Sequence, residues 1–297
     1  MLDLVRLSSR PLFPPGGRDL YRQIAVLADV KPGDELLVVA CGTGVTLEYF
    51  VREYAVQGYG VEPDPDLAKA TEQWGREADP RSRFQVQQAP VDDLPYRDGM
   101  FDVVVGEIGL TTSAAPEDAI AELVRVAKPG ARIALVQLVW KAPVEPERQE
   151  ALSRHLGAKP HMLVEIKRAL RAVGIERLHV EAWTDEETAF RPALKKPFPD
   201  FAELFSLPEK LGILRRVWGR WGWHGVRTAI GREVTIHRLL TRERILGLDM
   251  IVGRKSGEAP EVGDTADGGE ASEEGEESAG EDETTAELPL FAPPNRS

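Results

Sequence analysis

A short glycine turn and a downstream carboxylate are the residues of this chain whose types and spacing are best suited to chemistry. The turn contains Cys41, Gly42, Thr43 and Gly44, and Glu62 follows Gly44 by 18 residues. An apolar run leads into the turn, and a second apolar run ends at Glu62. Glycines let a backbone approach a ligand closely, and a carboxylate after the second strand accepts hydrogen bonds from a ribose diol. The pattern predicts an open α/β sheet that binds an adenosine-containing cofactor.

The turn lacks one feature of dinucleotide sites. A G-x-G-x-x-G turn has a third glycine, which permits close helix–strand packing and leaves a pyrophosphate on the helix N-terminus. Leu47 stands at the position of that third glycine. The sequence therefore predicts no pyrophosphate cradle and disfavours a nicotinamide dinucleotide.

The elements that must position these residues follow from hydrophobic periodicity. Strands are predicted at 35–40, 55–62, 84–88, 101–106, 131–139, 175–183 and 247–253. Helices are predicted at 18–29, 45–54, 65–78, 116–128, 147–156, 162–172, 208–218 and 226–244. The long interval between the last two strands indicates an insertion at 184–246.

Several motifs occur in the order and spacing of a known family. They are residues 38–44, 93–96, 98–99, 101–105, 123–131 and 248–255. With these motifs the chain resembles the class I S-adenosylmethionine-dependent methyltransferases, in particular the small-molecule type 11 group. The resemblance covers roughly residues 20–138 and resumes near Met250. It implies a Rossmann-like sheet of order 3-2-1-4-5 with an antiparallel edge hairpin, here with a largely helical insertion.

The resemblance also implies a site and a cofactor, S-adenosyl-L-methionine. Ala40 and the Gly42–Thr43–Gly44 turn would line the methionine end of this cofactor. Glu62 would accept the ribose hydroxyls, and Pro63 would pack on the adenine.

Adenine recognition departs from the family pattern. Pro90 occupies the position where the family carries an acid after the third strand. Val91 keeps its N–H for the ring, and Asp92 is the remaining carboxylate that would accept from the adenine amine.

The resemblance places the reacting groups after the fourth strand. Gly106 and Glu107 would lie where methyl donor and acceptor meet. Glu107 is a weak candidate catalytic base, the alternative being a positioning role. No metal ligand spacing occurs among the histidines.

The proposed activity is methyl transfer to a small organic acceptor, and two alternatives stay open. One is an RNA or DNA methyltransferase. Cys41 lies in the glycine turn rather than at a nucleophile position, and the run after Gly106 lacks an Asn/Asp-Pro-Pro-aromatic sequence. These two observations disfavour two nucleic-acid chemistries. The other alternative is a non-catalytic cofactor-binding or partner-binding protein with the same fold.

Composition separates the chain into two parts. The net charge is -12, and the segment 256–297 alone holds thirteen acidic residues and one basic residue, so residues 1–255 sum to zero. We therefore predict a methyltransferase domain at 1–255, with a cofactor-binding core at 18–139, and a disordered acidic tail at 256–297. A cytoplasmic location is expected, because the chain carries a single cysteine and no long apolar run.

Two further segments suggest partners. The stretch from Arg215 to Arg227 interleaves arginines with tryptophans. It is interpreted first as packing onto the domain, and otherwise as a substrate lid or as a membrane or nucleic-acid surface. Near the C-terminus a short apolar motif resembles a peptide ligand; it consists of Leu288, Pro289, Leu290 and Phe291.

Overall fold

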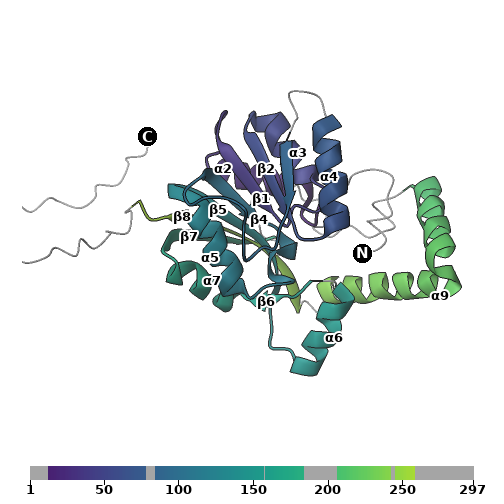
Figure 1. Ribbon diagram of the computed structural model, residues 1–297. Helices are drawn as coiled ribbons and strands as arrows, with labels where there is room; N and C mark the ends of the chain where they lie inside the picture. Colours follow the sequence, from purple (N-terminus) through teal and green to yellow (C-terminus); the bar gives the residue numbers. More distant parts are fainter. Residues whose placement is uncertain (1–12, 78–83, 157, 184–205, 242–244, 258–297) are drawn as a thin grey trace, which may run out of the picture. The chain divides into compact units, whose positions relative to one another are not determined.

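The computed structural model describes residues 13–77, 84–156, 158–183, 206–241 and 245–257 (Figure 1). All of these described residues belong to one compact unit. The predicted acidic tail beyond residue 257, the C-terminal apolar motif and the first part of the insertion lie outside the described residues. What the sequence predicts for these segments therefore stays a prediction.

The sheet has the topology that the sequence predicts. Its order is β3-β2-β1-β4-β5-β8-β7, with β6 paired to β5. The strands are β1 (Glu35–Val39), β2 (Gln57–Glu62), β3 (Phe84–Gln88), β4 (Phe101–Gly106), β5 (Ala127–Trp140), β6 (His161–Met162), β7 (Ile175–Ala182) and β8 (Leu246–Lys255). The strands from β1 to β5 pair in parallel, whereas β8 is antiparallel to both β5 and β7. The predicted antiparallel hairpin at the edge is confirmed.

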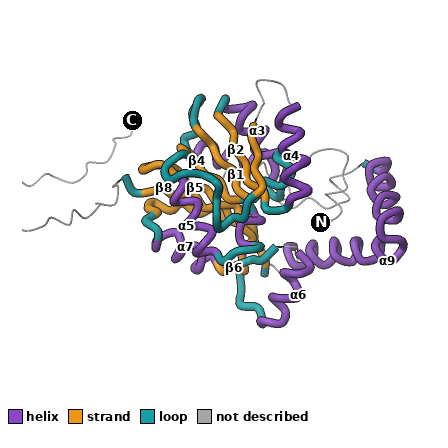
Figure 2. Tube along the Cα trace, in the orientation of Figure 1, coloured by secondary structure: helices purple, strands orange, loops and turns teal. Residues whose placement is uncertain are grey.

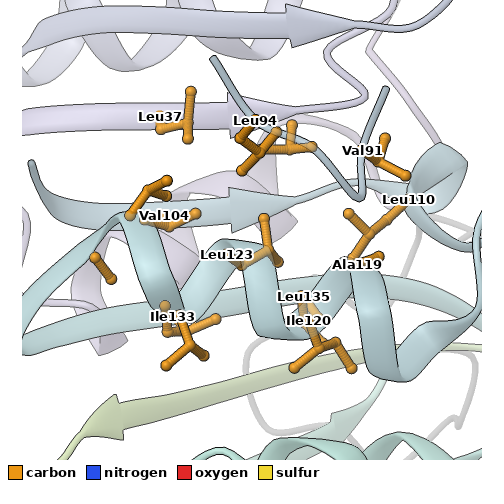
Figure 3. Packing of buried hydrophobic residues seen from close by; sticks show 14 of the residues in the cluster. Leu37, Val91, Leu94, Val104, Leu110, Ala119, Ile120, Leu123, Ile133 and Leu135 are labelled. Carbon is orange, nitrogen blue, oxygen red and sulfur yellow. The ribbon is translucent and has the colours of Figure 1, made fainter. Parts of the chain in front are cut away.

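Helices form a layer on each face of the sheet. They are α2 (Gly17–Leu27), α3 (Val45–Tyr54), α4 (Pro65–Glu77), η1 (Ile108–Thr111), α5 (Pro116–Val126), α6 (Pro146–Leu156), α7 (Leu163–Ala172) and α9 (Leu207–Thr241). One buried cluster joins the sheet to α2 and α3, and another joins it to α5 and α7. In the second cluster, Ile120 and Leu123 of α5 pack with apolar side chains of the sheet, namely Leu37 of β1, Val104 of β4, and Ile133 and Leu135 of β5 (Figure 3). The alternation of faces along each strand puts successive side chains into different clusters.

Most predicted bounds agree with the structure to within two residues, and the start of β5 differs most. β5 begins at Ala127 rather than at residue 131, because Ala127 pairs with Phe101 and the register then shifts before Val103. Gly130 takes a φ of +78°, which accommodates this irregularity. The two helices predicted within the insertion are the two halves of α9, which meet at a kink at Gly222 (Figure 2).

Arg125 anchors the loop between β3 and β4 to α5. Its Nε donates to Glu122 Oε1 at 2.6 Å, and its Nη1 donates to Asp98 Oδ1 at 2.7 Å. The same guanidinium donates to the carbonyl oxygens of Leu94 and Tyr96, at 3.0 and 2.8 Å. These carboxylates raise the pKa of Arg125 and keep it charged. Glu122 Oε2 also accepts from the Leu94 N–H at 2.8 Å, so the loop that carries Val91 and Asp92 is held by the Arg125–Glu122 pair.

We expect Arg125→Met to lower the free energy of unfolding by about 1–2 kcal/mol, because two carbonyls and two carboxylates lose a charged donor that is partly screened by solvent. Urea denaturation measures the change. Arg154→Met is the matched control, since Arg154 pairs with Glu150 on an exposed helix surface, and we expect it to cost less than about 0.5 kcal/mol. Equal losses in the two variants would contradict an anchoring role.

Within the described residues, no helix combines the length and the apolar character needed to cross a membrane.

Candidate functional site

The carboxyl ends of β1, β2 and β4 meet at one edge of the sheet. The Cys41 N–H donates to Val61 O at 3.1 Å, which ties the glycine turn to the end of β2. The Glu107 N–H donates to Val39 O at 3.0 Å, which ties the residue after β4 to the end of β1. Parallel strands present such ends together, and ligands of open α/β sheets bind there. The fold thus brings together the glycine turn, Glu62 and Glu107.

Glu62 is held in place by backbone donors. The Gly42 N–H donates to Oε2 at 2.8 Å, and the Asp64 N–H donates to Oε1 at 3.1 Å. Its side chain is buried, with 6% of the residue exposed. These two N–H groups fix the direction of the carboxylate at the end of β2. A carboxylate at this place in an open α/β sheet is the group that accepts hydrogen bonds from a ribose diol.

The two glycines of the turn are needed for different reasons. Both have positive φ, +54° at Gly42 and +74° at Gly44. A Cβ at Gly42 would meet nothing within 4 Å, so the space beside this residue is open. A Cβ at Gly44 would lie 2.5 Å from Thr71 Cγ2. Gly44 thus permits close packing of α4, and of the two glycines only Gly42 borders open space.

Ala40 connects β1 to the turn in an unusual backbone conformation. Its φ is +58°, in the left-handed region that residues other than glycine avoid. Such conformations persist where the surroundings determine them, and they gather at functional sites. Ala40 is nearly buried, and a Cβ on Gly109 would lie 3.0 Å from its Cβ. The segment after β4 therefore packs closely against the turn.

Glu107 is a buried carboxyl group among polar side chains. Thr46, in the first turn of α3, donates a short hydrogen bond to Glu107 Oε1. Burial raises the pKa of Glu107 to about 8, the charge of Glu62 adds to this effect, and the Thr46 and Tyr21 hydroxyls act against it. Tyr21 is itself fully buried, and its hydroxyl faces Glu107 without the geometry of an ordinary hydrogen bond. At neutral pH the Glu107 carboxyl is mostly protonated.

The backbone of Glu107 is fixed from β5. The Gln137 side-chain amide donates to Glu107 O at 2.8 Å. The Thr111 hydroxyl lies 3.3 Å from Gln137 Oε1 and 3.2 Å from Lys159 O. This buried chain of polar groups sets the position of the segment after β4, and with it the direction of the Glu107 side chain.

The other predicted cofactor residues lie around this edge with differing exposure. Thr43 and Asp92 are exposed, Pro63 is half-buried and Val91 is fully buried. A Cβ at Gly106 would lie 2.8 Å from the side chains of Leu110 and Leu135. Gly106 is therefore required by packing of the apolar core, a role that the sequence did not indicate.

Three polar residues of the site were not predicted. Tyr21 and Thr46 face Glu107, and the Thr71 hydroxyl donates to Gly42 O at 2.9 Å. Tyr21 lies in α2, where the predicted amphipathic pattern uses Leu20 and Ile24 as the buried side. For Thr46 the sequence did offer a signal, because this residue follows the glycine turn by two positions and lies at the start of a predicted helix.

Cys41 points into the apolar core rather than into the site. It is buried, and it belongs to the cluster that packs under α3. Burial first, and then the charges of Glu62 and Glu107, raise the pKa of its thiol well above the ordinary value. A thiol in this state is a poor nucleophile. Within the described part of the chain, no group of His, Cys, Asp or Glu side chains has the arrangement of a metal site.

Comparison with known proteins identifies the domain that carries this site. Residues 37–135 match the family model described as "Methyltransferase domain". A relative from Penicillium expansum named O-methyltransferase cnsE is 26% identical over 181 residues, which are 60% of this chain and 64% of that protein. A demethylmenaquinone methyltransferase of Clavibacter sepedonicus is 28% identical over 58% of this chain and 69% of that protein. The chain thus spans about two thirds of the length of these two relatives, and 52–63% of the length of five further ones.

Solved structures share the architecture at low identity. A phosphoethanolamine N-methyltransferase 2 of Haemonchus contortus, in complex with S-adenosyl-L-methionine, superposes with a TM-score of 0.65. It is 14% identical, and the alignment covers 86% of this chain and 56% of that one. This similarity supports the Rossmann-like assignment of the fold.

Proposed function

We propose that the protein is a class I methyltransferase of the type 11 group, which the match of residues 37–135 to the methyltransferase family model supports, and that it transfers a methyl group from S-adenosyl-L-methionine to a small organic acceptor. One observation carries the proposal. The open space at Gly42 lies beside a buried carboxylate, Glu62, that the Gly42 N–H itself orients. A glycine turn next to an oriented acid is the arrangement that an adenosyl group requires.

In this proposal different residues at this edge of the sheet bind different parts of the cofactor. Glu62 accepts the ribose hydroxyls, with its carboxylate oriented by the N–H groups of Gly42 and Asp64. The Ala40–Gly44 turn borders the methionine end, and Pro63, Val91 and Asp92 lie at the adenine end. Asp92, whose side chain is exposed, accepts from the adenine amine.

The reaction needs little from the protein beyond positioning and a dry pocket. The bound cofactor supplies a methyl group on a sulfonium, which is displaced in line by a lone pair of the acceptor as the carbon–sulfur bond breaks. When the attacking atom carries a hydrogen, a proton must leave. Glu107, with a pKa of about 8, is placed in our proposal to accept it, since general bases work best near the operating pH.

The acceptor is proposed to be a small and largely apolar molecule. The relatives are named for methyl transfer to quinones, to tocopherol and to an alkaloid. A small apolar cluster follows the carboxyl end of β5 and supports this choice; it contains Trp140, Leu152, Ala158 and Leu246, with Ile108 packed against it. We also propose a cytoplasmic location, which the single, unpaired Cys41 supports.

The test is incubation of the full chain with methyl-labelled S-adenosylmethionine and fractionated cell extract. We expect label in the small-molecule or lipid-soluble fraction and none in nucleic acid. We also expect a rate that rises with pH toward about pH 8 if Glu107 takes the proton, and Glu107→Gln to lose that pH dependence.

Other distributions of label decide for the alternatives. Label in RNA or DNA would assign the protein to the nucleic-acid methyltransferases. No label in any fraction, from a chain that binds S-adenosylhomocysteine in a titration, would favour the non-catalytic alternative and overturn the proposed reaction.

A further inference from the structure

The helix α9 exposes apolar side chains along one side. In its first half Leu207, Leu211 and Trp218 are 74%, 69% and 60% exposed. Their spacing of four and seven residues places them on one helical face. Ile213 and Val217, on another face, are almost completely buried. The helix therefore packs through the face that carries Ile213 and Val217, and the exposed apolar row lies on a different face.

A second exposed row continues beyond the bend. Gly222, with φ 64° and ψ -166°, separates the two halves of α9, which Figure 1 draws as two helical segments meeting at an angle. After the bend Trp223, Ile230 and Val234 are 68%, 47% and 53% exposed, again at helical spacing. The rings of Trp218 and Trp223 lie with centroids 5.9 Å apart. The two rows therefore meet at the bend, and together they form one surface that we call the α9 stripe: Leu207, Leu211, Trp218, Trp223, Ile230 and Val234.

Basic residues accompany the stripe. From Lys210 to Arg232 the sequence contains six lysines or arginines and no aspartate or glutamate. Arg215, Arg216 and Arg227 are exposed on α9. Exposed apolar patches of this kind on a monomer mark an interaction site. Here the patch has an excess of positive charge beside it, since Glu209 and Glu233 are the acidic residues of 207–234 against the six basic ones.

We propose that the α9 stripe docks on an anionic lipid surface, with its leucines and tryptophans in the interface and its arginines at the headgroups. Helices that lie in a membrane interface combine a row of Trp and Leu with a face of Lys and Arg. Indole rings settle at the headgroup level, and each arginine near an anionic leaflet adds to the attraction. The proposal concerns attachment alone and does not depend on the proposed reaction.

Two other occupants fit the observations less well. A second copy of this chain would bring the same surface to a two-fold contact, and six positive charges would face six others. A nucleic acid would bind the arginines and stack on the tryptophans, but it would offer no apolar contact to Leu207 and Leu211, which are the most exposed residues of the stripe. A bilayer offers contacts both to the charged and to the aliphatic side chains.

The experiment measures partition of the full-length chain onto vesicles by sedimentation and by tryptophan emission. One vesicle preparation is phosphatidylcholine alone and the other is phosphatidylcholine mixed with phosphatidylglycerol. Trp140 and Trp183 are buried, so a blue shift on binding reports mainly on α9. We expect partition onto the anionic vesicles, weakening from about 50 mM to about 500 mM salt.

Two variants separate the apolar and the charged parts, each with a matched control. Leu211→Glu should reduce partition about tenfold, whereas Val26→Glu should leave it unchanged, since Val26 is 67% exposed on α2. The double variant Arg215→Glu/Arg216→Glu should reduce it at least about tenfold. The double variant Arg168→Glu/Arg171→Glu, at exposed positions of α7, keeps the same net charge and should have less effect. Circular dichroism verifies that all four variants are folded.

Several results would overturn the proposal. These are no partition of the wild-type chain, equal partition of the α9 variants and their controls, or equal binding to neutral and anionic vesicles. A concentration-dependent dimer that Leu211→Glu abolishes, without vesicle binding, would assign the stripe to a second copy. Binding of a short duplex that only the arginine variant loses, again without vesicle binding, would assign it to nucleic acid.

Discussion

Gly42→Val is expected to reduce the affinity for S-adenosylhomocysteine at least about 100-fold, or roughly 2.7 kcal/mol. The side chain would occupy the open space beside Gly42, where a Cβ meets no protein atom. It would also disturb the N–H that orients Glu62. Both effects act on the proposed adenosyl site directly. Isothermal titration calorimetry of the folded variant measures the loss.

The chain offers a matched control for the backbone cost of this change. Gly99 also has a positive φ, +65°, and a Cβ there would likewise meet nothing within 4 Å. A β-branched residue in the left-handed region is strained at either position, at a cost of order 1–3 kcal/mol in stability. Gly99→Val should therefore be destabilised to a similar degree and still bind. Wild-type affinity in Gly42→Val would remove the turn from the cofactor site, and equal loss in both variants would assign the effect to stability.

Glu107→Gln is expected to change how stability depends on pH. Burial raises the pKa of Glu107 from 4.5 to about 8, so between these values the folded chain holds a proton that the unfolded chain has released. The stabilisation that Glu107 contributes is fully present below its pKa in the unfolded chain, and it is lost as the pH rises through its pKa in the folded chain. The slope is at most about 1.4 kcal/mol per pH unit. Between about pH 5 and about pH 8, the free energy of unfolding of the variant should therefore fall by about 2–3 kcal/mol less than that of the wild type.

Urea denaturation across this range measures the effect. Glu122→Gln is the control of opposite sign, because Arg125 lowers the pKa of Glu122. The stability that Glu122 contributes is present above its unfolded pKa and is lost only as the pH falls through the lower, folded pKa. Its removal should leave the slope above about pH 5 unchanged. Parallel curves for wild type and Glu107→Gln would show that Glu107 is ionised in the folded protein.

Much of the fold was predictable from local pattern. The bounds of α3, β3 and β4 agree with prediction to the residue, because each is a run of consistent periodicity with a glycine or proline near one end. The order of the strands followed from the resemblance. The start of β5 was not predicted, because it depends on pairing with Phe101, which is remote in sequence.

The residues of the candidate site also fall into those that the sequence indicated and those that only the structure revealed. The sequence by itself determined the glycine turn and Glu62, because residue type and spacing alone indicate a close backbone approach and an acid at a strand end. Only the tertiary structure decided that Gly44 serves the packing of Thr71, that Gly42 alone borders open space, and that Tyr21 and Thr46 face Glu107. The physical reason is that these properties are set by distance and burial between α2, α3, α4 and the strand ends. A raised pKa and an exposed apolar row exist only once the chain has excluded water from some surfaces and left others bare.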